Sequence, residues 1–321
     1  MATHQPHRRR FLRLLGHALG GAAATRALPG VTAALLAGAP ARLVADDLHR
    51  RALPGNDETI PAVGLGTYVT FNVGPDEAMR EQLTEVLQIF FDMGGGMIDS
   101  SPMYGTAEEV LGDCLGRLDD TAGMFSATKV WTRSTAEGRE QIDDSLSLWG
   151  IDRFDLMQVH NLVNWQEHLE TMRQRRDGGD IHYLGITTSH GRRHGELEGI
   201  MRDEPLDFVQ LTYNILDREV EDRLLPLARE RGIAVIANRP FRRGALFDRV
   251  DGRPLPDWAG EYAIDNWAQF FLKFIISHPD VTCAIPATSR PEHMRENMGA
   301  MRGPLPDADT RRAMVDYLED L

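Results

Sequence analysis

Residues 124–160, "MFSATKVWTRSTAEGREQIDDSLSLWGIDRFDLMQVH", show most clearly how strands and helices alternate in this chain. The stretch begins with a short apolar run at 124–130 and ends with another at 154–160, both of strand length. Between them, residues 135–150 place apolar side chains three and four positions apart, which is typical of a helix with one buried face. Two strands joined through such a helix lie parallel in one sheet, so their carboxyl ends meet at the same edge.

The same alternation continues along the chain after residue 60. Eight apolar runs are candidate strands: 62–67, 96–100, 124–130, 154–160, 181–188, 207–213, 233–241 and 281–287. Amphipathic stretches such as 76–94 separate them. Eight such units predict an α/β fold, a single (β/α)8 TIM barrel preceded by a signal-like N-terminal segment.

A doubly wound sheet is the alternative to the barrel. That fold would place G-x-G-x-x-G after its first strand, and "VGLGTY" at 63–68 does not supply it. The longest gap between strands, residues 242–262, contains prolines and glycines and is predicted to be a loop over the barrel mouth.

The body of the chain is acidic. The 321 residues have a formal net charge of −13, and the first 45 contain six arginines and no acid. The rest therefore holds 29 basic against 48 acidic residues, which repels nucleic acid and anionic lipid. Cys114 and Cys283 form no zinc pattern, so we expect two buried free thiols and no metal site.

Residues 1–45 resemble a targeting segment rather than part of the fold. The motif "RRRFLR" at 8–13 is similar to a twin-arginine export signal, and a mild Ala- and Gly-rich apolar stretch follows it. Arg26 and Pro29 interrupt that stretch, so we expect no stable membrane insertion. Candidate cleavage sites are Ala39-Pro40-Ala41 and the "LVA" at 43–45.

This segment predicts an exported protein. We expect the twin-arginine export machinery as a partner and a periplasmic or extracytoplasmic location, with the barrel over residues 46–321. A basic arm on a cytoplasmic protein is the alternative.

Polar side chains stand at the predicted strand ends, where TIM barrels place their active sites. In chain order these are Thr67, Asp99, Lys129, His160, Thr187, Thr188, Gln210, Asn238 and Arg239. Tyr104 follows Asp99 by five residues, so a carboxylate, a phenol, a lysine and a histidine come from neighbouring strand ends. Lys129 and Lys273 are the only lysines among 35 lysine and arginine residues, and a lysine presents a point charge that arginine does not.

Six motifs together resemble the aldo-keto reductase superfamily, from about Val63 to Asn297. They are "GLGTY", "MIDSSPMYG", "SATKVW", "QVHN", "FVQLTYN" and "IPATSRPEHMREN". The resemblance implies an Asp–Tyr–Lys–His catalytic tetrad at Asp99, Tyr104, Lys129 and His160. It also implies an NAD(P)H-dependent enzyme that reduces aldehydes or ketones to alcohols by hydride transfer.

The chemistry of the four side chains agrees with that implied tetrad. A free tyrosine has a pKa near 10, and we expect the Lys129 ammonium to lower the pKa of Tyr104 so that it can donate a proton. Asp99 would orient the lysine. A neutral His160 would hydrogen-bond the carbonyl oxygen and polarise it.

The resemblance also implies a nucleotide site. Its residues are Gly66, Thr67, Thr187, Thr188, Gln210, Asn238, Arg239, Pro240, Phe241, Gly244, Thr288, Ser289, Arg290, His293, Glu296 and Asn297. Ser289 and Glu292 form a candidate capping box with Pro291 in the first turn, whose free N–H groups would face an anion.

Two positions depart from the family's pattern. Ala287 and His293 stand where NADPH-preferring members often have a lysine and an arginine, so NADP(H) is only favoured and NAD(H) is possible. Asn238 stands where the family usually has an aromatic residue that stacks on the nicotinamide.

Tyr68, Trp131 and Asn161 are the predicted substrate pocket. Family members with narrow specificity often carry a longer C-terminal loop over the pocket. The resemblance therefore leads us to expect, for a chain that closes with the predicted helix before residue 321, an open site that accepts a broad range of aldehydes or ketones. Two alternative functions remain open. One is a nucleotide-binding redox-sensing module with little turnover, and the other is an oxidoreductase served by a membrane partner.

Overall fold

The computed structural model describes residues 48–321. The predictions that concern residues 1–45, including the arginine motif at 8–13 and the cleavage sites, lie outside the described residues. Within the described part, no helix is both long and apolar enough to span a bilayer.

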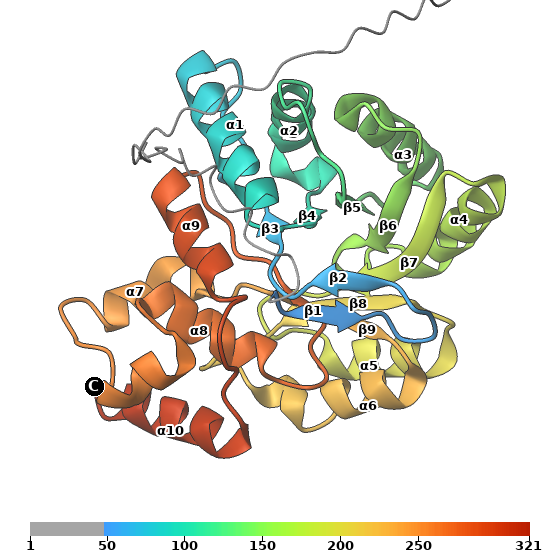
Figure 1. The fold of residues 1–321 in the computed structure, drawn as a ribbon. Coiled ribbons are helices and arrows are strands. Elements are labelled where there is room, and N and C mark those ends of the chain that lie inside the picture. Colours follow the sequence, from blue (N-terminus) through green and yellow to red (C-terminus); the bar gives the residue numbers. More distant parts are fainter. Residues whose placement is uncertain (1–47) are drawn as a thin grey trace, which may run out of the picture. The chain divides into compact units, whose positions relative to one another are not determined.

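Eight parallel strands form one sheet in chain order (Figure 1). They are β3 (Leu65–Gly66), β4 (Met97–Asp99), β5 (Phe125–Val130), β6 (Phe154–Val159), β7 (Ile181–Thr187), β8 (Phe208–Thr212), β9 (Ala234–Asn238) and β10 (Cys283–Ala284). Each coincides with one of the eight predicted strands. The sheet closes where Val63 pairs with Ala284 and where the Gly66 N–H donates to the Pro286 carbonyl at 2.9 Å. The predicted (β/α)8 barrel is confirmed.

Helices surround the strands (Figure 1). They are α1 (Glu77–Asp92), α2 (Ala107–Leu115), α3 (Thr135–Trp149), α4 (Trp165–Gly178), α5 (His194–Asp203), α6 (Leu224–Arg231), α7 (Ala245–Arg249), α8 (Trp267–Ile276), α9 (Pro291–Gly299) and α10 (Ala308–Glu319). Local chemistry sets their ends. In α3, the Ser134 side chain accepts the Glu137 N–H, and Gly150 takes the left-handed conformation at φ 67° that ends the helix.

A hairpin that the sequence analysis missed fills the amino-terminal end of the barrel. Its strands, β1 (Arg50–Ala52) and β2 (Thr59–Pro61), pair antiparallel. Leu53 and Ile60 belong to the same apolar cluster as barrel-interior residues such as Phe125 and Phe208, which lie at the starts of their strands. A strand of three residues is too short to show the alternation of apolar and polar side chains by which strands are predicted from sequence.

The segment at 242–262 is not the plain loop that was predicted. It contains the short helices η5 (Arg242–Gly244), α7 and η6 (Asp257–Tyr262). These helices are too short to show a repeating pattern of apolar residues in the sequence. Elsewhere in residues 48–321, further 3₁₀ turns are η2 (Pro102–Tyr104), η3 (His160–Leu162) and η4 (Glu219–Glu221). Cys114 and Cys283 are buried and free, as predicted.

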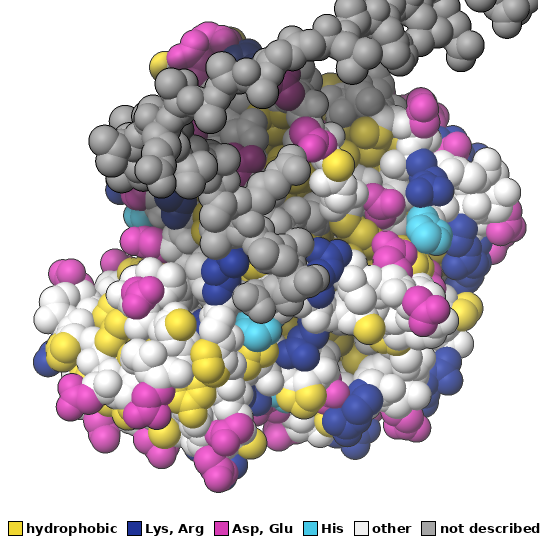
Figure 2. Space-filling model, in the orientation of Figure 1, with side chains coloured by type: hydrophobic (Ala, Val, Ile, Leu, Met, Phe, Trp, Pro, Cys, Tyr) yellow, Lys and Arg dark blue, Asp and Glu magenta, His cyan; other side chains and the backbone are white. Residues whose placement is uncertain are grey.

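Charged side chains of both signs are interspersed over the face of the molecule drawn in Figure 2. The described side chains on that face therefore form no continuous basic surface for a polyanion. The expectation that nucleic acid is not a partner stays a prediction.

Lys273 is a structural residue of α8. It is 0% exposed, and its Nζ donates to the carbonyl oxygens of Tyr262 at 2.5 Å, Arg302 at 2.5 Å and Pro304 at 3.1 Å. Burial lowers its pKa to about 8, with Asp265 acting in the opposite direction, so the ammonium persists at neutral pH. The three carbonyls use all three N–H donors and tie η6 and the 302–304 turn to α8.

We predict that Lys273→Met destabilises the fold by about 3 kcal/mol or more, because three buried carbonyl oxygens lose their donor at once. Urea unfolding followed by circular dichroism measures the effect. Arg312→Met, on the exposed side of α10, is the control and should change stability little. Equal midpoints for Lys273→Met and the wild type would show that the ammonium does not hold these segments together.

Candidate active site

A cavity of about 590 Å³ opens at the carboxyl ends of the barrel strands. It brings together most of the predicted site residues: Gly66, Thr67, Tyr68, Asp99, Tyr104, His160, Asn161, Thr187, Thr188, Gln210, Asn238, Arg239, Pro240, Phe241 and Gly244. Lys129 lies behind this lining and is 1% exposed.

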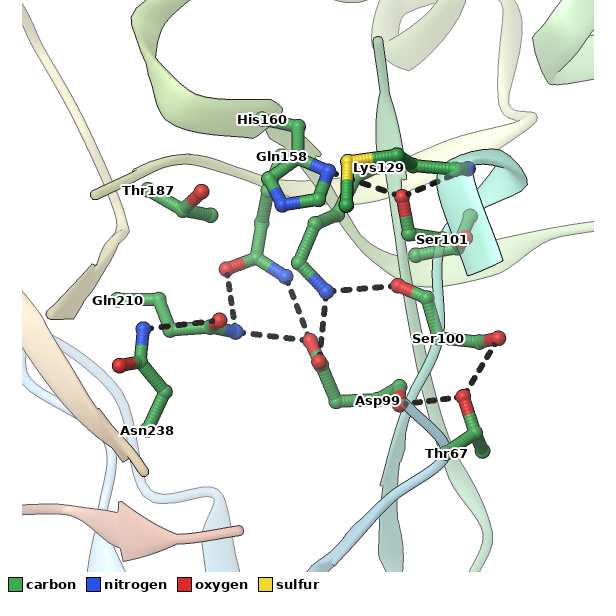
Figure 3. Close-up of polar contacts among 12 residues, drawn as sticks. Thr67, Asp99, Ser100, Ser101, Lys129, Gln158, His160, Thr187, Gln210 and Asn238 are labelled. Atoms are coloured by element: carbon green, nitrogen blue, oxygen red, sulfur yellow. Dashed lines mark hydrogen bonds and ion pairs between the residues drawn. The ribbon is translucent and has the colours of Figure 1, made fainter. Parts of the chain in front are cut away.

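Lys129 and Asp99 form a buried ion pair (Figure 3). Lys129 Nζ donates to Asp99 Oδ2 at 2.6 Å and to the Ser100 carbonyl at 2.7 Å. Burial acts to lower the pKa of Lys129, but Asp99 and Tyr104 together outweigh burial, and the pKa is raised above its usual value. Lys129 is therefore an ammonium at neutral pH.

The second carboxylate oxygen of Asp99 accepts two side-chain amides (Figure 3). Gln158 Nε2 lies 3.1 Å from Asp99 Oδ1, and Gln210 Nε2 lies 2.8 Å from the same oxygen. Gln158 was not among the predicted site residues. It lies two residues before His160, a spacing that places alternate strand residues on one side of the sheet, and this was the available signal.

Tyr104 ends the short η2 helix that follows β4. Its ring packs edge-on against the rings of Tyr68, with centroids 5.0 Å apart, and His160, with centroids 5.8 Å apart. Lys129 Nζ lies 5.2 Å from the Tyr104 ring centroid. The phenol is thus held between an ammonium and an imidazole.

Burial raises the pKa of Tyr104 above its usual value near 10. The Lys129 charge acts to lower this pKa, and the Asp99 charge acts to raise it. The ammonium acts in the predicted direction, but the prediction of a lowered pKa is wrong because burial outweighs that charge. Tyr104 is therefore a neutral phenol at neutral pH, which carries a proton that it can donate.

His160 follows β6 and is 5% exposed. Burial, followed by the Lys129 charge, lowers the pKa of His160 to about 2. The imidazole is neutral at physiological pH, as the sequence predicted. Its Nδ1 lies 3.0 Å from Ser101 Oγ.

Amides and hydroxyls line the inner part of the cavity. Asn238 Nδ2 donates to the Thr188 carbonyl at 2.9 Å, and Asn238 Oδ1 accepts from Thr212 Oγ1 at 2.8 Å. Thr187 Oγ1 accepts the Asn161 N–H at 3.1 Å. These bonds hold Asn238 and Thr187 in one orientation at the cavity wall.

Basic side chains lie at the cavity's edge. Arg243 Nη2 donates to Tyr68 Oη at 3.1 Å, and its guanidinium lies 5.0 Å from the Tyr68 ring centroid. Arg239 Nε is buried and has no hydrogen-bond partner within residues 48–321. Burial, then the charges of Arg239 and Arg243, lower the pKa of His190, which also lines the cavity. Arg239 and Arg243 therefore place positive charge where an anionic group of a ligand could bind.

The sequence model of the Aldo/keto reductase family matches residues 62–314. The chain belongs to this family. The predicted enzyme class, an NAD(P)H-dependent aldo-keto reductase, is thereby confirmed.

Individual relatives agree with this assignment. The NADH-specific methylglyoxal reductase of Escherichia coli (strain K12) is 26% identical, over 82% of this chain and 97% of its own length. The aldo-keto reductase yakc [NADP(+)] of Schizosaccharomyces pombe (strain 972 / ATCC 24843) is 25% identical, over 80% of this chain and 88% of its own. The crystal structure of an aldo/keto reductase from Klebsiella pneumoniae in complex with NADP and acetate superposes with a TM-score of 0.70 at 26% identity, covering 83% of this chain and 94% of that one.

The segment at the start of α9 stands apart from the cavity. The predicted site residues Thr288, Ser289, Arg290, His293, Glu296 and Asn297 are not among the residues that line it. The predicted capping box is wrong. Arg290 is the N-cap residue of α9, its side chain makes no cap hydrogen bond, and Pro291 takes the first helical position.

Two hydrogen bonds and the ring of Pro291 explain this start of α9. Thr288 Oγ1 accepts the Arg290 N–H at 3.0 Å, and the Ser289 carbonyl accepts from Gln82 Nε2 at 2.5 Å. The fixed φ of Pro291 sets the helix start one residue later than the spacing of Ser289 and Glu292 suggested.

Trp131 lies in a neighbouring hollow rather than in this cavity. It is 42% exposed and shares the hollow with residues such as Pro102, Gln141 and Val163. Further lining residues were not predicted: Val69, Thr70, Met103, Ser189, His190, Phe247 and Ile285. Most of them lie in loops, where no periodic pattern marks which side chains point inward.

Within the described part, no three His, Cys, Asp or Glu side chains gather as a metal-binding group.

We predict that Gln158→Leu lowers kcat for carbonyl reduction about tenfold or more, with little change in KM for the nucleotide. The variant removes one of two amide donors to buried Asp99 Oδ1, and Gln158 itself does not line the cavity. Steady-state kinetics measure both constants. Gln174→Leu, on the exposed side of α4, is the matched control, and an unchanged kcat for Gln158→Leu would contradict the prediction.

Proposed function

We propose that this protein reduces small aldehydes or ketones to alcohols, with NADP(H) as the favoured cofactor, NAD(H) as a possible one, and Tyr104 as the proton donor. The observation that carries the proposal is the buried Lys129–Asp99 pair behind a cavity-lining phenol and a neutral imidazole. Such a set can place a proton and a hydrogen-bond donor around one carbonyl oxygen.

The cavity fits a nicotinamide nucleotide. Its inner wall supplies fixed amide and hydroxyl groups from Thr187, Thr188, Gln210 and Asn238, and its edge supplies guanidinium groups from Arg239 and Arg243. Arg239 Nε, which has no hydrogen-bond partner among residues 48–321, is a donor suited to a phosphate oxygen. When bound, a reduced nicotinamide supplies the hydride that carbonyl reduction requires.

The residues of this chain supply the proton. In the proposed step the Tyr104 hydroxyl donates its proton to the carbonyl oxygen as negative charge develops there. His160 donates a hydrogen bond to the same oxygen. The Lys129 ammonium stabilises the tyrosinate that remains, and Asp99 keeps the ammonium in place.

The cofactor preference follows from the charges near α9. Ala287 and His293 provide no lysine and arginine for a 2′-phosphate, whereas the Arg290 side chain is 63% exposed and available for one. Relatives differ in the cofactor that their names give. The Escherichia coli relative is named NADH-specific, and the Schizosaccharomyces pombe relative is named with NADP(+). Arg290 and the cavity-edge arginines support NADP(H).

We predict that Tyr104→Phe lowers kcat about a thousandfold or more while nucleotide affinity changes little, because the phenylalanine ring keeps its packing and loses only the proton donor. Kinetics with a panel of aldehydes and fluorescence titration of the nucleotide measure the two effects. Because the pKa of Tyr104 is raised and that of His160 is about 2, the wild-type reduction rate should stay level between about pH 6 and 9. Full activity in Tyr104→Phe would exclude the proposed donor.

A nucleotide-binding module with little turnover makes the opposite prediction. Nucleotide would then stay bound through purification and no aldehyde would be consumed. The complete polar set around Tyr104 favours turnover.

We also propose that the protein is exported by the twin-arginine machinery, on the motif at residues 8–13. We predict that Arg8→Lys with Arg9→Lys abolishes export, because the signal depends on the arginine pair. Cell fractionation of the full chain measures this. An equal periplasmic fraction for variant and wild type, or a wild type that stays in the cytoplasm, would contradict the proposal.

A further inference from the structure

Ser101 lies in the turn between β4 and η2, two residues after Asp99 and three before Tyr104. It is 0% exposed. Its side chain is the cap of η2, and its Oγ also reaches the imidazole of His160 (Figure 3). One buried hydroxyl therefore contacts both the segment that carries Tyr104 and the imidazole of His160, the two groups that would face the substrate carbonyl in the proposed reaction.

The partners of the Ser101 hydroxyl fix the direction of its hydrogen bonds. The Met103 N–H lies 3.2 Å from Ser101 Oγ and can only donate to it. His160 Nδ1 lies 3.0 Å from Oγ, and within residues 48–321 Oγ has no other hydrogen-bond partner. The hydroxyl hydrogen therefore has a single available acceptor, which is His160 Nδ1.

The reverse direction would be costly. If His160 Nδ1 carried the hydrogen, Ser101 Oγ would accept twice and its own hydrogen would have no acceptor at a fully buried position. Buried donors are rarely left unpaired, because the loss of a hydrogen bond without solvent to replace it is unfavourable.

A neutral imidazole carries one ring hydrogen, so an accepting Nδ1 places that hydrogen on Nε2. We infer that Ser101 is a positioning residue that holds His160 in the Nε2–H tautomer, so that the ring presents a hydrogen-bond donor to the carbonyl oxygen in the cavity. The inference about the tautomer stands on the hydrogen bonds alone. Its catalytic consequence rests on the proposed reductase function.

Ser101 acts apart from the Lys129–Asp99 pair. Lys129 contacts Asp99 and the Ser100 carbonyl, and the amides of Gln158 and Gln210 reach Asp99. Ser101 Oγ contacts none of these groups. The hydrogen bonds to the ion pair and those of Ser101 Oγ therefore share no side chain.

The experiment is nitrogen-15 NMR of the imidazole rings in the full-length protein, wild type and Ser101→Ala, at pH 7. Ring nitrogen shifts distinguish the two neutral tautomers, and loss of one signal set in His160→Asn assigns the residue. We expect the Nε2–H tautomer alone in the wild type and a mixture that includes Nδ1–H in Ser101→Ala. We also expect kcat to fall about tenfold in Ser101→Ala, with KM for the nucleotide unchanged.

Ser134→Ala is the matched control. Ser134 caps α3 as Ser101 caps η2, and its Oγ accepts the Glu137 N–H at 3.3 Å, but it does not contact His160. It should leave the His160 tautomer and kcat as in the wild type.

Two results would overturn the inference: an Nδ1–H tautomer in the wild type, or an unchanged tautomer in Ser101→Ala. A protein with the expected tautomers that reduces no carbonyl compound would refute the proposed function and leave the structural inference standing.

Discussion

The ion pair between Lys129 and Asp99 is the interaction on which the site depends. A buried pair costs free energy of desolvation, and it is stable only where each charge has its full set of partners. Here the carboxylate uses both oxygens, one for the ammonium and one for two amides, and the ammonium also donates to a backbone carbonyl. Partners come from β4, β5, β6 and β8, so only the closed barrel assembles them.

The two lysines of the chain show two ways of burying an ammonium. Lys129 is neutralised by a carboxylate, and its charge remains close to the ring of Tyr104. Lys273 has three backbone carbonyls as acceptors, which use all of its N–H donors and leave none for chemistry. The first arrangement maintains a charge beside a reactive group, and the second joins chain segments.

The two ends of the barrel differ in strain as well as in chemistry. The amino-terminal end is filled by apolar side chains, among them those of the hairpin. At the opposite end, the cavity lining includes Val69, Asn161, His190, Arg239 and Arg243, five of the ten non-glycine residues with positive φ in the described part. Such conformations cost free energy and persist where surrounding structure imposes them, which is common at functional sites.

The eight strands, the barrel and the convergence of Asp99, Tyr104, Lys129 and His160 were predictable from the sequence. Strand and helix periodicity is a local property of the chain, and parallel strands joined by helices end at one shared edge. Tertiary structure decided that burial outweighs the Lys129 charge at Tyr104, that Gln158 serves Asp99, and that Ser101 reaches His160. It also decided the hairpin and the start of α9. Each of these depends on solvent exclusion or on contacts between residues distant in the chain, and neither can be read from spacing along one strand.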